Sequence, residues 1–174
     1  MDSLRIQSAI SEATEYLTAH PDEARYTDSP AVAVVEDGLR CRVSGPSGED
    51  LATDMPSSVG GAGTAPSPGW FLRAAEASCV ATLIVMRSAV LGAEVGRVEV
   101  TVDSESDDRG ILGLDASVPA GPLTGRVVIH FGGGGARETL LREIATWAVD
   151  HCPVTDAVRR PVPFAVSVEI EGGP

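Results

Sequence analysis

The sequence has few basic residues for its length. Its 174 residues include 13 Lys and Arg against 25 Asp and Glu, which gives a formal net charge of -12 at pH 7. Proteins that bind nucleic acid or an anionic membrane surface need a basic patch to neutralise phosphates. We therefore expect neither nucleic acid nor a membrane among the partners of this chain.

Cysteine is also scarce. The chain has three cysteines, Cys41, Cys79 and Cys152, an odd and small number that does not make a disulfide framework and suits a reducing compartment. Residues 1–20 carry neither the basic region nor the apolar core of a signal peptide, and no targeting motif stands at either end. These features predict a cytoplasmic protein with free thiols.

Several sequence motifs of cofactor and metal sites are missing. The three cysteines and three histidines show no C-x-x-C or H-x-x-x-H spacing, so no metal site is predicted. The glycine run at 132–135 lacks a following Lys-Ser/Thr and the G-x-G-x-x-G spacing, which argues against a phosphate-binding loop. No G-x-S-x-G elbow supports a hydrolase. We expect no cofactor.

The longest apolar stretch runs from Pro68 to Leu91 and contains Cys79. It has no Gly or Pro after Gly69 and opens with Ser-Pro, so it is predicted to form one long helix. Apolar residues occupy nearly every face, which is typical of a helix buried in a membrane or in a protein core. Charges at Arg73, Glu76 and Arg87 interrupt the run below the roughly 18 apolar residues that a membrane span needs. We interpret it as a core helix.

The rest of the chain alternates strand and helix patterns. The predicted elements are an amphipathic helix (4–17), a hairpin (31–35 and 39–43) around Asp37-Gly38, a long loop (44–68), strands (97–103, 111–118 and 126–131), a helix (139–149), a short helix (155–160) and a closing strand (164–170). This order predicts an α+β fold. We divide the chain into an N-terminal helical extension, residues 1–25, and a single domain, residues 26–174.

A second landmark is His151-Cys152-Pro153-Val154, which follows the second long helix. Pro153 fits the first position of the short helix and leaves Cys152 at its N-cap, where free N–H groups favour a thiolate. His151 adds a cation next to it when protonated. Cys41, in a strand, is interpreted as an ordinary packing residue.

Two motifs together resemble the OsmC/Ohr family of osmotically inducible and organic hydroperoxide resistance proteins. The first is the A-x-x-x-x-C pattern of the long helix, preceded by Gly60-Gly61-Ala62-Gly63 and Ser67-Pro68, and the second is the late Cys-Pro-Val. The resemblance runs from Ala31 to Ile170. It implies an intertwined homodimer in which two long central helices are wrapped by curved β-sheets. A helix that is apolar on all faces independently favours burial at a two-fold interface.

The resemblance also implies thiol peroxidase chemistry. Cys79 would be the peroxidatic residue, oxidised to a sulfenic acid by an organic hydroperoxide, and Cys152 would resolve it to a disulfide that a dithiol reduces. In active members an Arg of the first hairpin, steered by a Glu after the helix-opening Pro, holds the thiolate. Here Gly69 stands at the Glu position and Glu36 or Asp37 at the Arg position.

Nearby charges can modify this machinery. Arg40, Arg42 and Arg73 are candidates to replace the missing cation, whereas Glu76, three residues before Cys79, is expected to raise the pKa of that thiol.

Three hypotheses follow. The first is a thiol-dependent peroxidase that uses Cys79 and Cys152. The second is a non-catalytic dimer of the same fold that binds a small apolar ligand in the cleft between subunits. The third is another cysteine chemistry with Cys152 as the nucleophile.

Overall fold

The computed structural model describes residues 3–171 and combines helices with antiparallel strands. The elements are, in chain order, α1 (Ser3–Ala19), the 3-10 helix η1 (Pro21–Ala24), β1 (Val32–Asp37), β2 (Arg40–Ser44), β3 (Asp50–Thr53), the 3-10 helix η2 (Ser57–Val59), α2 (Pro68–Val90), β4 (Arg97–Glu105), α3 (Asp108–Ile111), β5 (Thr124–Gly132), α4 (Glu138–Asp150) and α5 (Pro153–Arg159). The predicted α+β class is confirmed.

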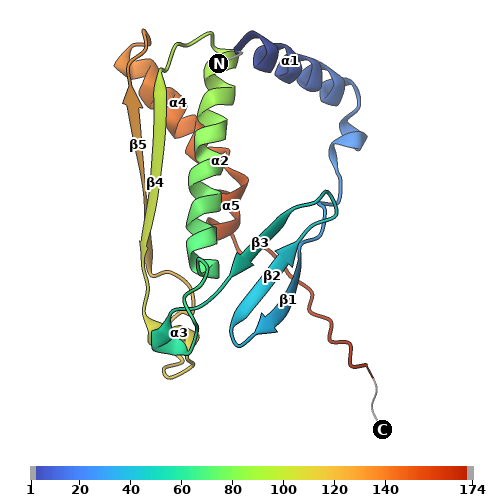
Figure 1. Ribbon diagram of the computed structural model, residues 1–174. Coiled ribbons are helices and arrows are strands. Elements are labelled where there is room, and N and C mark those ends of the chain that lie inside the picture. The colour runs from blue at the N-terminus through green and yellow to red at the C-terminus, as the bar shows by residue number, and fades with distance from the viewer. Residues whose placement is uncertain (1–2, 172–174) are drawn as a thin grey trace.

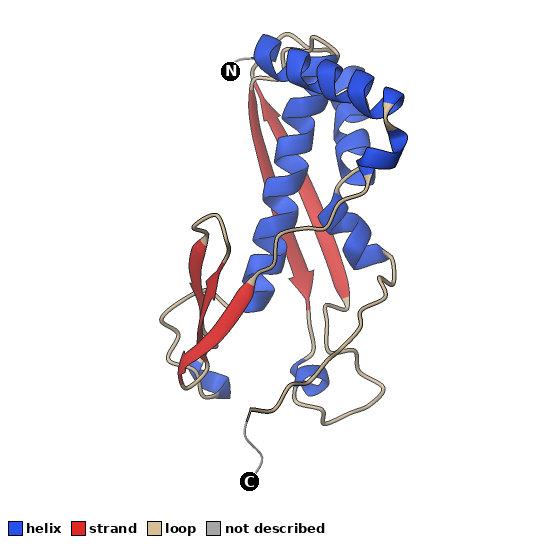
Figure 2. Cartoon of the chain, turned by 90° about the vertical axis from the view of Figure 1, so that its right-hand side faces the viewer, coloured by secondary structure: helices blue, strands red, loops and turns tan. Residues whose placement is uncertain are grey.

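Helix α2 is the central element of the chain. The antiparallel pair β4-β5 lies along one side, α4 and α5 pack against it, and α1 crosses near its C-terminal end (Figure 1). The antiparallel sheet β1-β2-β3 lies beside the N-terminal half of α2, as both views show (Figures 1 and 2). The elements that carry Cys79 and Cys152, α2 and α5, are therefore neighbours.

The start of α2 is set by its first residues. Ser67 caps the helix by accepting a 3.2 Å hydrogen bond from the backbone N–H of Trp70, and Pro68 follows at the first helical position. One face of α2 then enters the core, where Val80 and Ile84 are fully buried with Ile144 of α4. The predicted helix start and core position are confirmed.

The other faces of α2 are not covered within one chain. Its buried residues are Val80, Ile84, Ser88 and Ala89, whereas Trp70 is 49% exposed and Leu72 38% exposed. By length and composition α2 could also cross a membrane. Its contacts with β4, α4 and α5 instead give it the position of a core helix in a layered fold.

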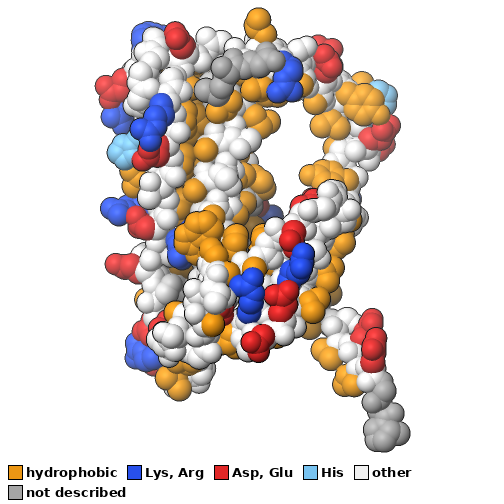
Figure 3. Space-filling model, viewed as in Figure 1, with side chains coloured by type: hydrophobic (Ala, Val, Ile, Leu, Met, Phe, Trp, Pro, Cys, Tyr) orange, Lys and Arg blue, Asp and Glu red, His pale blue; other side chains and the backbone are white. Residues whose placement is uncertain are grey.

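The surface of the chain is large for its mass. The solvent-accessible area is 12600 Å² for 18.0 kDa, whereas a compact monomer of this mass exposes about 8,000 Å². An opening bounded by α1, the β1-β2-β3 sheet and α2 accounts for part of the excess, and hydrophobic side chains line it (Figure 3). One chain thus leaves an extensive apolar surface uncovered.

The hairpin follows the predicted pattern. Val35 pairs with Cys41 and Asp37 with Arg40, with an irregularity between these two pairs. Gly38 supplies the positive φ of 54° that the tight turn requires. The segment expected to be a loop, residues 44–68, contributes a third strand, β3, which pairs with β2.

Two predicted strands are wrong within the described residues. Residues 111–118 form no strand, because Asp107 caps the short helix α3 by accepting from the Arg109 N–H at 3.0 Å, and Gly113 then turns the chain at a φ of 66°. Residues 164–170 alternate strictly but pair with no described strand of the same chain. Strand β4 extends to Glu105, two residues beyond the predicted strand 97–103.

Candidate functional site

The structure brings Cys79 and Cys152 together in the core. Cys79 lies on α2 and is half-buried, and Cys152 caps the N-terminus of α5 and is fully buried. Both thiols are free, and a hydrogen bond joins them. Val80, Ile84 and Ala148 belong to the same apolar cluster. Residues 73 positions apart thus form one thiol pair (152 - 79 = 73).

The two thiols have opposite pKa shifts. Burial raises the pKa of Cys79 first, and the hydrogen bond and charge of Cys152 raise it further, against a smaller opposing effect of the Val154 N–H. Burial also raises the pKa of Cys152, but the hydroxyl and N–H of Thr155, the Cys79 thiol and the Val154 N–H together hold it below its ordinary value. When the pair loses a proton, Cys152 therefore carries the negative charge and the Cys79 thiol donates to it.

Glu76 lies on α2 one turn before Cys79, and its carboxylate belongs to this site. Its Oε1 accepts a 2.9 Å hydrogen bond from the hydroxyl of Thr155. The N–H of the same threonine points at the Cys152 sulfur at 3.4 Å. Glu76 is not among the groups that raise the pKa of Cys79, which are burial and Cys152. The sequence-based expectation for Glu76 is therefore corrected: its contact is with Thr155.

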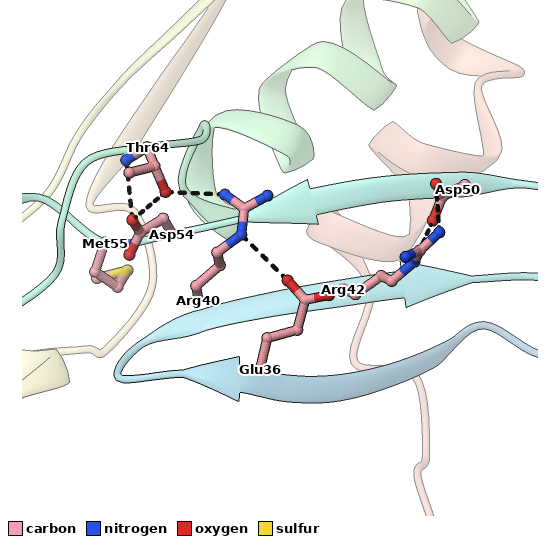
Figure 4. A network of polar contacts seen from close by, with 7 residues as sticks. All are labelled: Glu36, Arg40, Arg42, Asp50, Asp54, Met55 and Thr64. Carbon is pink, nitrogen blue, oxygen red and sulfur yellow. Dashed lines mark hydrogen bonds and ion pairs between the residues drawn. The ribbon is translucent and has the colours of Figure 1, made fainter.

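Arg40 belongs to a polar network in the hairpin (Figure 4). Its Nε pairs with Oε2 of Glu36 at 3.2 Å, and its Nη1 donates to Oγ1 of Thr64 at 2.8 Å. The Thr64 hydroxyl in turn donates to Oδ2 of Asp54 at 2.8 Å. Arg40 thus connects β2 to the loop that leads into α2, and within the described chain its partners are Glu36 and Thr64.

The other candidate modulators lie away from the sulfur atoms. Arg42 makes a two-pronged contact with Asp50, at 2.8 and 3.0 Å. Arg73 donates to the hydroxyl of Ser104 on β4 at 3.3 Å. His151 stacks on the ring of Trp147, with ring centroids 4.2 Å apart, and one ring nitrogen lies 2.8 Å from the Trp147 carbonyl. Of the predicted site residues, the structure gathers Cys79, Cys152 and Glu76.

Three polar residues that sequence reasoning missed complete both networks, and two of them, Thr155 and Asp54, are buried. Thr155 is third after Cys152, the helical position whose N–H faces the N-cap, so its spacing is a usable signal. Asp54 and Thr64 lie ten residues apart in a loop with no recognisable pattern. Within residues 3–171, no group of three or more His, Cys, Asp or Glu side chains is placed to hold a metal ion.

Comparisons with known proteins show the family and the fold of the chain. A family model described as OsmC-like protein matches residues 61–167. No curated protein matches the chain. Similar solved structures include an OsmC-like protein from Mycoplasma pneumoniae, with 11% identity, a TM-score of 0.65, and coverage of 78% of this chain and 89% of that one.

Two organic hydroperoxide resistance proteins are also similar in structure. The protein from Legionella pneumophila has 21% identity and a TM-score of 0.58, with 78% of this chain and 91% of that one covered. The protein from Elizabethkingia anophelis has 16% identity and a TM-score of 0.59, with 79% and 92% covered. These likenesses establish a shared fold. Because the matched family segment covers more than half of the 174 residues and includes both cysteines of the thiol pair, the chain belongs to the OsmC-like family.

Proposed function

We propose that this protein is a thiol-dependent peroxidase that reduces organic hydroperoxides through Cys79 and Cys152. The observation that supports this most is the contact between the two thiols, one half-buried on α2 and one fully buried at the start of α5. Membership of the OsmC-like family and the fold shared with hydroperoxide resistance proteins support the same chemistry. The apolar cluster around the pair favours an organic peroxide over hydrogen peroxide.

The exposure of the two sulfurs assigns their roles in this proposal. Cys79 is half-buried, so a peroxide can reach it, whereas Cys152 is fully buried and suits the resolving step. The Cys79 sulfur attacks the outer peroxide oxygen, the O–O bond breaks, and the alkoxide leaves and takes up a proton. The Cys152 thiolate, which the opposite pKa shifts favour over a Cys79 thiolate, accepts the Cys79 proton as this step begins. As a proton acceptor, Cys152 thereby provides part of the activation of Cys79 that a nearby cation would otherwise provide.

The cycle closes through a disulfide. Cys152 attacks the sulfur of the Cys79 sulfenic acid, the S–O bond breaks, and water leaves. A dithiol then reduces the disulfide and is itself oxidised. Cys41 lies on β2 and pairs with Val35, so we assign it no role in the cycle.

Peroxide consumption by the reduced protein tests this function. With a dithiol present, the protein should consume cumene hydroperoxide faster than hydrogen peroxide. Cys79→Ser should abolish consumption, Cys152→Ser should stop after one turnover with a sulfenic acid on Cys79, and Cys41→Ser should match the wild type. Full activity of Cys79→Ser would contradict the proposal.

The pairing of Arg40 and Arg42 with other side chains favours a second candidate function, the binding of a ligand without catalysis. Arg40 is paired with Glu36 and Thr64, and Arg42 with Asp50, so neither holds the Cys79 thiolate within the described chain. A non-catalytic dimer that binds a small apolar ligand between subunits would need no such cation. That function predicts no peroxide consumption but saturable binding of cumyl alcohol in calorimetry, unchanged in Cys79→Ser.

We further propose that the protein is a homodimer. The excess surface is about 4,600 Å² per chain, the difference between 12600 Å² and the area of about 8,000 Å² expected for the mass. It is larger than the roughly 1,000–2,500 Å² that each partner of an obligate dimer buries, so one chain has ample surface for such an interface. The uncovered faces of α2 and the opening beside it give a second copy a place to pack.

A further inference from the structure

Thr155 connects a carboxylate to the buried thiol. The residue is 2% exposed, and its hydroxyl lies 2.9 Å from Oε1 of Glu76. The Thr155 side chain also interacts with the Cys152 thiol. The backbone N–H of Thr155 points at the same sulfur at 3.4 Å. Glu76, Thr155 and Cys152 therefore form a continuous chain of polar groups across the interface of α2 and α5.

A threonine hydroxyl has only one proton to donate. When that proton points at an ionised Glu76, the oxygen of Thr155 can only accept, and the Cys152 thiol is its natural donor. When the proton points instead at a Cys152 thiolate, the oxygen accepts from a protonated Glu76. The two arrangements differ by the transfer of one proton from Cys152 to Glu76 through Thr155.

The Glu76 end of this chain of polar groups faces a cavity. Glu76 and Thr155 line a cavity of about 370 Å³ together with Arg126 of β5 and Arg159 of α5. Arg126 is paired with Asp103 of β4, and Arg73, one turn before Glu76 on α2, contacts Ser104. The remaining side chains that line the cavity are the apolar Val127, Val149 and Val158. The cavity gives a proton that reaches Glu76 a way to solvent.

We propose that Glu76 and Thr155 form a proton relay that activates Cys152 for disulfide formation. The inference rests on the proposed Cys79 and Cys152 chemistry and adds a positioning residue, Glu76, that acts through Thr155. As the Cys152 sulfur forms a bond to the Cys79 sulfur, its proton passes to Thr155 and the Thr155 proton passes to Glu76. The S–O bond of the Cys79 sulfenic acid breaks, and the oxygen leaves with the electron pair as hydroxide and takes up a proton to become water. Glu76 releases its proton to solvent through the cavity, so that one thiol and one sulfenic acid give one disulfide and one water.

The relay can be measured without peroxide. In a Cys41→Ser background, dithiobis(nitrobenzoate) reacts with Cys79 and releases one nitrothiolate. Cys152 then attacks the Cys79 sulfur of the mixed disulfide and releases a second nitrothiolate. This leaving group needs no proton at neutral pH, so the Cys152 proton must go to an acceptor in the protein or to solvent. The rate of the second release between pH 6 and 8 therefore reports the relay.

The relay predicts how fast the second nitrothiolate is released and how that rate depends on pH. The second release should change little with pH in the parent protein, because the acceptor of the Cys152 proton is a group of the protein and not hydroxide in solution. Glu76→Gln and Thr155→Val should slow it at pH 6 by about a hundredfold or more, the low end for general base catalysis. Both variants should also make the rate rise about tenfold per pH unit, because the proton then goes to solvent. The double variant should be no slower than either single variant, because both interrupt one path.

Two control variants separate this role from a structural one. Thr155→Ser keeps the hydroxyl and should retain the parent profile, and Glu99→Gln on β4, whose partner is Arg97, should have no effect. A faster second release in Glu76→Gln, an equal slowing at every pH, or a Thr155→Ser profile like that of Thr155→Val would overturn the relay. Lack of peroxide consumption with an intact relay profile would instead contradict only the peroxidase function.

Discussion

Nη1 of Arg40 donates a 2.8 Å hydrogen bond to Oγ1 of Thr64, and the Thr64 hydroxyl donates a 2.8 Å hydrogen bond to Oδ2 of Asp54. These two hydrogen bonds run in one direction, from the guanidinium through the hydroxyl to the carboxylate. The guanidinium that the sequence suggested as a thiolate partner is thus part of the support of the loop before α2. Gly61 fits into the same loop, because a Cβ there would lie 1.9 Å from the Met55 carbonyl oxygen.

The first prediction concerns Asp54, which is 1% exposed. The N–H of Thr64 and then its hydroxyl lower the pKa of this carboxyl, with a smaller contribution from the Met55 N–H, against burial. Asp54→Asn should lower the Tm by several degrees at pH 7, because an amide cannot satisfy the same donors. A thermal melt monitored by circular dichroism measures this, with Asp50→Asn on the exposed edge of the sheet as the control.

The pH dependence of that effect has a definite sign. A depressed folded-state pKa gives stability that is fully present above the unfolded Asp value, about 3.9, and is lost as the pH falls through the folded value. The Tm difference between wild type and Asp54→Asn should therefore be constant above about pH 5 and shrink below about pH 4. A difference that grows with acid would contradict this account of the network.

The second prediction concerns Gly69, near the start of α2. A Cβ built at this residue lies 3.9 Å from its nearest neighbours, Arg73 Nη1 and Ser67 Oγ, so a side chain fits without strain. Gly69→Ala should stabilise the protein by about 0.5–1 kcal/mol through helix propensity. Gly69→Glu should add about 0.3–1 kcal/mol from the helix dipole and the Arg73 charge four residues on. Urea unfolding measures both, and Gly69→Lys, which reverses the charge, should fall below Gly69→Ala.

The sequence predicted elements whose signals are local. The Asp37-Gly38 turn, the Ser67-Pro68 helix start and the Cys152-Pro153 cap each depend on residues within one turn, and all three are found. Contacts between distant segments had no such signal. The Thr155 hydroxyl meets Glu76 across 79 residues, and the tether of Arg40 to Thr64 spans 24. Side chains of these types are polar surface residues in most sequences, so pairing them needs the fold.

The failed strands illustrate two different limits. The apolar side chains of residues 111–118 favour a strand, but Asp107 and Gly113 form a helix cap and a turn there. For residues 164–170 the alternation is a true strand pattern, but a strand also needs a neighbour with free hydrogen-bonding groups. The described chain supplies none at that place, so the pattern alone could not decide the outcome.

The third prediction concerns the reactivity of Cys79. Burial and Cys152 both raise the pKa of this thiol, so at pH 7 it is mainly protonated. Alkylation of Cys79 in a Cys41→Ser protein should therefore have its midpoint above that of an ordinary thiol. Cys152→Ser removes the hydrogen bond and the charge of Cys152 and should shift the midpoint downward. Mass spectrometry of the α2 peptide after timed alkylation gives the profile, and a midpoint below neutrality in the Cys41→Ser protein would contradict the raised pKa.

The fourth prediction joins the unpaired C-terminal segment to the proposed homodimer. Phe164, Val166, Val168 and Ile170 alternate with other residues and are 78–89% exposed, so one face of an extended segment is wholly apolar and uncovered. We expect this segment to form a strand against a second copy, which would bury that face. Sedimentation should show a dimer at micromolar concentration, and Val166→Asp should raise its dissociation constant at least tenfold, because a charge would replace a buried apolar side chain at the interface.

The matched control uses the alternation itself. Ser167 points to the opposite face of an extended chain, so Ser167→Asp introduces the same charge one residue away and should leave the dimer intact. If both substitutions weakened the dimer equally, charge alone would explain the effect and the segment would not be a strand with one buried face. A wild-type monomer at micromolar concentration would remove the dimer itself, and with it the explanation of the 12600 Å² surface.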